Sequence, residues 1–170
     1  PWARVLDLGT GSGCILVSLL AGRAEATGIG ADLSQGALAV AEGTAKALGV
    51  GERAEFRVSN WFESVSGKFD LIVSNPPYID DTVYAGLDPE VRDWEPELAL
   101  RAGPGGLDAY RRIVASSTDY LTSDGRLLLE IGWDQSRPVA DLLLSAGFVS
   151  VTVHPDFDGR DRVVEGRRQS

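Results

Sequence analysis

Residues 7–13 read Asp-Leu-Gly-Thr-Gly-Ser-Gly, and this stretch decides the fold because it joins an apolar strand to an apolar helix. The strand is predicted over residues 3–8 (ARVLDL) and the helix over residues 13–21. Alternate glycines let the backbone turn sharply and approach a ligand without a Cβ in the way. The helix N-terminus adds free N–H groups and a partial positive charge. The stretch therefore predicts a nucleotide-type site at the end of the first strand.

Outward from this turn, strand-like runs alternate with helical patterns, which is typical of a parallel sheet covered by helices on both faces. Ser34 is a plausible N-cap and Gly49 a plausible stop for a helix over residues 34–48. A turn is predicted at residues 123–125, and residues 79–106 show no periodicity. The remaining predicted strands are residues 26–31, 54–58, 69–74, 126–131, 149–154 and 162–166, and the remaining helices are residues 107–121 and 135–146.

Asp32 follows the second strand, where an acidic side chain can accept hydrogen bonds from both hydroxyls of a ribose. The glycine spacing of the first turn is Gly-x-Gly-x-Gly, one residue shorter than in dinucleotide folds and typical of adenosylmethionine enzymes. The alternative is an ordinary tight turn and a charge at a helix N-terminus. Since strand, loop, helix, strand and acid occur in the right order, we favour a cofactor site.

Asn75-Pro76-Pro77-Tyr78 follows the strand predicted over residues 69–74, beside the first strand of a doubly wound sheet. The prolines fix the backbone and have no N–H, which leaves carbonyl oxygens free to accept. With the Asn75 side chain they form a rigid set of acceptors for the hydrogens of an –NH₂ group. Such acceptors orient a weakly nucleophilic nitrogen and stabilise the charge that develops on it. The motif predicts methylation of a nitrogen, with Tyr78 stacking on a planar group or facing a cation.

These motifs resemble the HemK/PrmC family, methyltransferases that modify the glutamine of the Gly-Gly-Gln motif in peptide chain release factors. The resemblance covers almost the whole chain. It is carried by residues 5–15 (VLDLGTGSGCI), 74–79 (SNPPYI), 95–100 (EPELAL), 105–111 (GGLDAYR), 130–132 (EIG) with Gln135, and 159–164 (GRDRVV).

The resemblance implies a Rossmann-like class I methyltransferase fold: an α/β sheet, mostly parallel with an antiparallel last strand and helices on both faces. It places S-adenosylmethionine on Asp7, Gly9, Thr10, Gly11, Ser12, Gly13, Asp32, Asn60, Trp61 and Asn75. It implies a catalytic motif of Asn75, Pro76, Pro77 and Tyr78, with the substrate amide bound by Asn75, Pro76, Tyr78 and Trp94. The family often has Asp where this chain has Asn60, and commonly Phe where it has Trp94.

The length of 170 residues indicates one domain over residues 1–170. The resemblance implies that the family's helical N-terminal substrate-recognition domain is absent from this sequence. The sequence contains no Met and is interpreted as a piece of a longer protein. We expect a cytoplasmic protein, because residues 1–170 show no signal-peptide pattern and no apolar run of membrane-spanning length. The formal net charge of −9 argues against a nucleic-acid partner.

The nearest alternative is an adenine-N6 methyltransferase acting on DNA or RNA, which shares the Asn-Pro-Pro-Tyr motif. A nicotinamide oxidoreductase would leave the Asn-Pro-Pro-Tyr motif unexplained. The intact motif also argues against a module that only binds adenosylmethionine. No metal is expected: Asp156, Asp158 and Asp161 lack the spacing of a calcium loop. His154 is expected at the surface or in packing, Cys14 packed within the first helix, and Trp2 and Trp133 in the core or at an exposed surface.

Overall fold

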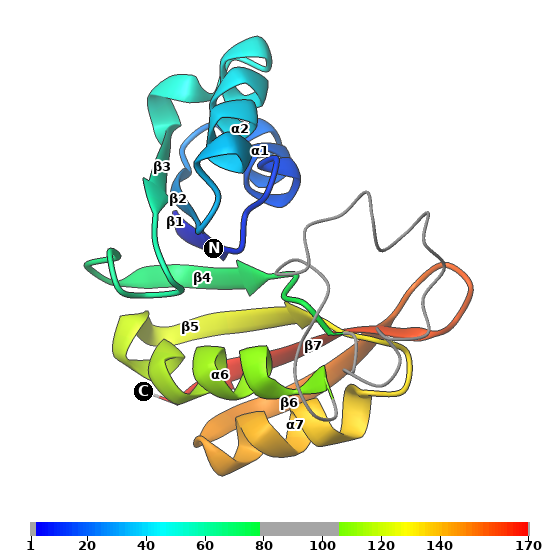
Figure 1. The fold of residues 1–170 in the computed structure, drawn as a ribbon. Coiled ribbons are helices and arrows are strands. Elements are labelled where there is room, and N and C mark those ends of the chain that lie inside the picture. Colours follow the sequence, from blue (N-terminus) through cyan, green and yellow to red (C-terminus); the bar gives the residue numbers. More distant parts are fainter. Residues whose placement is uncertain (1–2, 79–105, 170) are drawn as a thin grey trace.

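The computed structural model describes residues 3–78 and 106–169. These residues form a seven-stranded sheet in the order β3-β2-β1-β4-β5-β7-β6, with helices on both faces (Figure 1). The strands are β1 (Arg4–Leu8), β2 (Thr27–Asp32), β3 (Ala54–Val58), β4 (Phe69–Ser74), β5 (Leu121–Glu130), β6 (Phe148–Pro155) and β7 (Asp161–Arg168). The helices are α1 (Cys14–Ala21), α2 (Gln35–Ala47), α6 (Asp108–Tyr120) and α7 (Ser136–Ser145), with a 3₁₀ turn η1 (Gly51–Arg53).

Strand direction confirms the predicted fold class. β1 pairs in parallel with β2 and β4, and β3 and β5 extend the parallel sheet outward on either side. β7 lies between β5 and β6 and is antiparallel to both. Five neighbouring strands therefore end at the same edge of the sheet, which brings the loops that follow them together.

Alternation along the central strands produces two apolar cores. Val5 of β1 packs with Leu16, Val17 and Leu20 of α1 on one face of the sheet. Leu6 and Leu8 join the larger core on the other face, which α6 and α7 cover. Residues 5–8 of β1 are buried whichever face of the sheet they point to, and Asp7 is the one polar residue among them.

The predicted ends of α2 are confirmed. The Ser34 hydroxyl accepts a hydrogen bond from the Ala37 N–H (3.2 Å), and the chain leaves the helix through Gly49 at φ 69°. The turn predicted at residues 123–125 is wrong as a strand boundary, because β5 runs through it. The extra residues form an irregularity between the pairs Phe69↔Leu121 and Leu71↔Arg126, with Asp124 at φ 64°.

Two single residues were also placed. Cys14 does not pack as expected: it is the first residue of α1 and is exposed, because the buried stripe of this helix begins two residues later at Leu16. Trp133 is exposed, the second of the two positions considered for it. Trp2 lies outside the described residues.

Candidate active site

A cavity of about 530 Å³ lies at the carboxyl ends of the parallel strands. This volume suits a small-molecule ligand or cofactor. The lining residues come from the loop after β1, the end of β2 with the start of α2, the loop after β3 and the segment after β4. They are Gly9, Gly11, Asp32, Leu33, Ser34, Ala37, Ser59, Asn60, Trp61, Asn75 and Pro77.

The three glycines of the first loop have different functions. All have positive φ values, of 68° at Gly9, 55° at Gly11 and 81° at Gly13. Gly9 and Gly11 line the cavity, and a Cβ on Gly11 would meet nothing within 4 Å, so its backbone is open to a ligand. A Cβ on Gly13 would lie 2.9 Å from the Cβ of Ala41, so Gly13 allows α1 and α2 to approach closely. The structure brings Gly9 and Gly11 to the cavity, whereas Gly13 is buried behind it.

Asp32 joins the glycine loop to α2. Its Oδ2 accepts from the Gly11 N–H and its Oδ1 from the Ser34 N–H, both at 2.9 Å. A carboxylate oxygen has two lone pairs, so each oxygen retains one for a second donor. Asp32 is half-buried in the cavity wall, which is where a pair of ribose hydroxyls would need an acceptor.

Asp7 and Thr10 do not line the cavity, although both were predicted to bind cofactor. Asp7 is fully buried, and its Oδ2 accepts from the Thr10 hydroxyl (2.7 Å) and the Leu16 N–H (3.2 Å). Burial raises the pKa of the Asp7 carboxyl to about 6, and its Oδ1 has no hydrogen-bond partner. These two residues brace the loop from inside. Ser12 is exposed and is not part of the cavity wall.

Asn60 and Trp61 form the opposite wall. Trp61 adopts φ 53°, an uncommon backbone conformation for a bulky residue, and its ring lies against Gly9. The Ser59 hydroxyl donates to the Trp61 carbonyl (2.9 Å) and fixes this turn. Asn60 Nδ2 donates to Glu63 Oε1 (2.9 Å), which leaves its second amide hydrogen and its oxygen for a ligand.

The Asn-Pro-Pro-Tyr segment only partly faces the cavity. The Ser74 hydroxyl donates to the Leu8 carbonyl (2.7 Å) and ties the end of β4 to the end of β1. Asn75 and Pro77 line the cavity, and Asn75 is exposed to solvent. Pro76 is buried, and Tyr78 is half-buried with its ring against the larger core. Trp94 lies outside the described residues.

Four lining residues were not predicted as site residues: Leu33, Ser34, Ala37 and Ser59. The sequence offered one signal for Leu33 and Ser34: both directly follow Asp32, in the loop after the second strand. Gln135 was also missed, although it belongs to a segment that carries the resemblance. Its amide nitrogen donates to the carbonyl of Tyr78 (3.0 Å).

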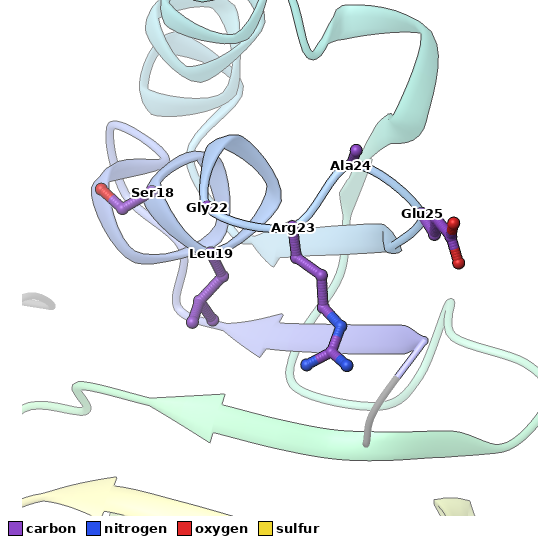
Figure 2. A pocket seen from close by; sticks show the side chains of 6 residues that line it. All are labelled: Ser18, Leu19, Gly22, Arg23, Ala24 and Glu25. Atoms are coloured by element: carbon purple, nitrogen blue, oxygen red, sulfur yellow. The ribbon is translucent and has the colours of Figure 1, made fainter.

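A second hollow, of about 560 Å³, lies at the end of α1 and in the turn before β2. This is the opposite edge of the sheet from the cavity. Figure 2 shows Ser18, Arg23 and Glu25 pointing in different directions, so they do not converge on a ligand.

Neither a metal centre nor a membrane span is found in the described parts of the chain. Residues 3–78 and 106–169 contain no group of three or more His, Cys, Asp or Glu side chains able to hold a metal ion. Asp156 instead accepts from the N–H groups of Asp158 and Arg160 and shapes the turn between β6 and β7. His154 is exposed and hydrogen-bonds Glu165 (2.9 Å). Among these same residues, no helix has the length and apolar character needed to cross a bilayer.

Comparison with solved structures agrees with the fold. The methyltransferase from Pyrococcus furiosus superposes with a TM-score of 0.74 at 16% identity, over 99% of this chain and 76% of that one. An RNA methyltransferase from Salinibacter ruber, solved with S-adenosyl-L-homocysteine, gives a TM-score of 0.62 at 16% identity, over 99% and 82%. At this identity the likeness shows the class I methyltransferase fold alone.

Sequence relatives are much closer. The chain is 58% identical to the release factor glutamine methyltransferase of Cereibacter sphaeroides over 98% of its own length, and 47% identical to that of Agrobacterium fabrum, also over 98%. This confirms the resemblance inferred from the motifs. The chain spans 60% and 57% of the length of these two relatives. Residues 2–86, which hold all the loops of the cavity, match the methyltransferase small domain, and the chain belongs to that family.

Proposed function

We propose that the chain transfers a methyl group from S-adenosylmethionine to the side-chain amide nitrogen of a glutamine in a protein, the Gly-Gly-Gln motif of a peptide chain release factor. The names of the relatives that are 58% and 47% identical support this substrate. We further propose that the reaction takes place in the cytoplasm, needs no metal, and involves neither nucleic acid nor a membrane as partner.

The observation that carries the proposal is a shared cavity. Asn75 and Pro77 lie in the same cavity wall as Gly9, Gly11 and Asp32. The glycine loop and Asp32 have the open backbone and the spare acceptors that an adenosine ligand requires. Asn75 adds an exposed amide beside them, at the end of a strand held to β1 through Ser74. A methyl donor and a nitrogen acceptor can therefore meet in one place.

S-adenosylmethionine would supply an electrophilic methyl group, and the chain would supply orientation. The Asn75 side-chain oxygen and a backbone carbonyl of the following prolines would accept the two hydrogens of the glutamine –NH₂ group. This arrangement would turn the nitrogen lone pair toward the donor and stabilise the positive charge as the N–C bond forms and the bond from the methyl carbon to sulfur breaks, with S-adenosylhomocysteine as the leaving group. The methylated nitrogen would then lose one proton to water.

The direct test uses this chain, S-adenosylmethionine carrying a labelled methyl group, and a purified release factor. We expect label on the glutamine of Gly-Gly-Gln, located by mass spectrometry, and no label when that glutamine is replaced by alanine. Oligonucleotides containing adenine form a second arm. Label on adenine in place of the release factor would overturn the proposal in favour of an adenine-N6 methyltransferase.

The cofactor site is tested with Asp32→Ala. This change should weaken binding of S-adenosylhomocysteine by roughly 1.5–3 kcal/mol, the usual scale for losing a charged acceptor. Isothermal calorimetry gives the dissociation constant, and Asp141→Ala on the exposed side of α7 is the matched control. An unchanged constant would reduce Asp32 to a brace between the glycine loop and α2.

A further inference from the structure

Gln135 uses both ends of its amide group on residues around the Asn-Pro-Pro-Tyr segment. It precedes α7 and is only 8% exposed. Its Nε2 donates to the carbonyls of Tyr78 (3.0 Å) and Gly106 (3.3 Å). Its Oε1 accepts from the Gly132 N–H (3.0 Å) and the Tyr110 hydroxyl (3.3 Å). One buried side chain thus connects the end of the motif, Gly106, α6 and the turn after β5.

The surroundings fix which way this amide points. Gly132 offers an N–H, whereas Tyr78 and Gly106 offer only carbonyls to Gln135. The Tyr110 hydroxyl does not decide the orientation, because its single hydrogen is shared between the Glu130 carbonyl (3.0 Å) and Gln135 Oε1 (3.3 Å). A flipped amide would place donors against donors and oxygen against carbonyl oxygen. Only one orientation satisfies all the partners.

The cluster is also closely packed. Gly106 has φ 65°, and a Cβ on it would lie 2.6 Å from Gln135 Nε2 and would collide with the Tyr78 carbonyl. The Tyr78 carbonyl therefore has little room to move while Gln135 holds it.

The motif needs such an external anchor because of its own composition. Pro76 and Pro77 have no N–H to donate, so the backbone of this segment cannot be fixed by a strand ladder. At the start of the segment the Ser74 hydroxyl donates a hydrogen bond to the Leu8 carbonyl. At its end the Gln135 amide donates one to the Tyr78 carbonyl. Both anchors are buried side chains, and the acceptors for the substrate nitrogen lie between them.

We propose that Gln135 is a positioning residue for methyl transfer, which sets the location of the backbone acceptors of residues 75–78 without touching the substrate. This inference rests on the proposed function. It predicts that a change at Gln135 lowers the rate of the chemical step and leaves cofactor affinity intact, because misplacing a reactive group by about 1 Å can cost on the order of a hundredfold in rate.

Two variants of the chain separate positioning from simple packing. Gln135→Glu retains an oxygen facing Gly132 and Tyr110, but at neutral pH it places a carboxylate oxygen against the carbonyls of Tyr78 and Gly106. Protonation restores an O–H donor at that position. Gln135→Met has nearly the same length and no amide at any pH. Gln169→Glu is the matched control, because Gln169 is exposed and follows the end of β7 at the opposite edge of the sheet.

The first measurement is single-turnover methyl transfer to the release factor, as a ratio of variant to wild type at each pH. Taking the ratio removes titrations common to both proteins. We expect Gln135→Glu to be roughly ten to a hundred times slower at about pH 8.5 and to recover as the pH falls toward about 6. Gln135→Met should be slow by a similar factor with a flat ratio. For both variants the dissociation constant of S-adenosylhomocysteine should stay within about twofold of wild type.

The second measurement needs no substrate. The NMR shift of the Tyr78 carbonyl carbon should change in both variants at neutral pH, because that carbonyl loses its donor. Hydrogen exchange should accelerate at the Gly132 amide in Gln135→Met only, since Glu retains the acceptor for Gly132. Full-speed transfer by Gln135→Met, or an unchanged Tyr78 carbonyl shift, would overturn the role of Gln135. Equal losses of cofactor binding and rate would overturn it too, since that pattern indicates general unfolding. A wild-type chain that never labels the release factor would overturn the proposed function instead, and the Tyr78 carbonyl shift would still decide whether Gln135 holds the end of the motif.

Discussion

Asp7 and Asp32 are both carboxylates at the cavity edge of the sheet, and their surroundings give them different properties. Asp32 is half-buried and accepts backbone N–H groups with both oxygens. Asp7 is fully buried, and its Oδ1 has no partner. Burial disfavours the charged form and raises the pKa of Asp7 from 3.8 to about 6, although the bonds from Thr10 and Leu16 oppose this. At neutral pH Asp7 therefore carries a charge that destabilises the fold.

Asp7→Asn tests this through the pH dependence of stability. Because the folded protein favours protonated Asp7, its contribution to stability is complete below about pH 3.8 and is lost as the pH rises through about 6. The free energy of unfolding of wild type minus that of the variant should fall across this window by at most about 3 kcal/mol. Urea unfolding at several pH values measures it. The same trend with Asp141→Asn would indicate a general charge effect.

We propose that Asn75 takes part in methyl transfer, because it is exposed in the wall of the cavity at the end of β4. Asn75→Ala should slow single-turnover methyl transfer about a hundredfold to a thousandfold, the usual effect of losing one preorganised hydrogen-bonding partner. Cofactor affinity should change much less. Asn75→Asp retains an oxygen acceptor and should be faster than the alanine variant. An alanine variant at full speed would leave the motif as a structural turn.

At the scale of elements, the sequence predicted those helix ends that depend on neighbouring residues. Ser34 and Gly49 mark the ends of α2 because capping depends on neighbouring residues. The path of β5 through residues 123–125 was not predictable, because it depends on pairing with β4 before and after these residues, at Leu121 and at Arg126. The sequence pattern identified the glycine loop but not which of its residues line the cavity. Whether Asp7 or Gly13 faces a ligand depends on packing against α1 and α2.

The end of α1 shows a long-range contact that sequence could not reveal. This helix has no basic residue in its last turn. The Arg53 guanidinium instead donates to the carbonyls of Leu20 (2.9 Å), Arg23 (3.0 Å) and Ala26 (2.7 Å). A residue more than twenty positions away thus satisfies the end of the helix and the turn that follows.

Arg53→Ala should lower the free energy of unfolding by roughly 1–3 kcal/mol, because three carbonyls lose the guanidinium donor, although those of Leu20 and Arg23 keep a backbone N–H. Arg53→Lys should recover only part of the lost free energy of unfolding, since one ammonium group cannot reach all three carbonyls. Cofactor affinity should not change, as these carbonyls lie at the edge of the sheet opposite the cavity. Thermal and urea unfolding measure the loss, with Arg112→Ala on the exposed side of α6 as the control. An equal loss in that control would deny Arg53 a specific role.

At the scale of the whole molecule, the mostly parallel sheet and the pairing of β4 with β1 were predictable from the sequence, because a parallel sheet has few arrangements. The loops after β1, β2 and β4 meet, as expected, and Gly9, Gly11, Asp32, Asn60, Trp61 and Asn75 share one cavity. The anchoring of Tyr78 by Gln135 was not predictable, since it joins residues 57 positions apart.

The relatives are longer than this chain, so we expect cofactor binding and substrate recognition to separate. The 170-residue chain should bind S-adenosylhomocysteine about as tightly as the Cereibacter sphaeroides relative. Its KM for release factor should be higher by at least about tenfold, equivalent to about 1.4 kcal/mol of lost docking energy. Steady-state kinetics and calorimetry on both proteins provide the comparison. Equal KM values would show that these 170 residues contain the whole docking surface.

The order of strands in the sheet also affects how the chain folds while it is being synthesised. Among the described residues, those that line the cavity lie between Gly9 and Pro77, whereas β5, the partner of β4 on its second side, begins only at Leu121. When synthesis has passed Pro77, these lining residues are all present, yet β4 is then a bare sheet edge and Phe69 and Ile72 lack the apolar cover of α6. Such an edge invites pairing with other chains. We therefore expect the emerging protein to depend on chaperones most strongly in the interval before Glu130 leaves the exit tunnel.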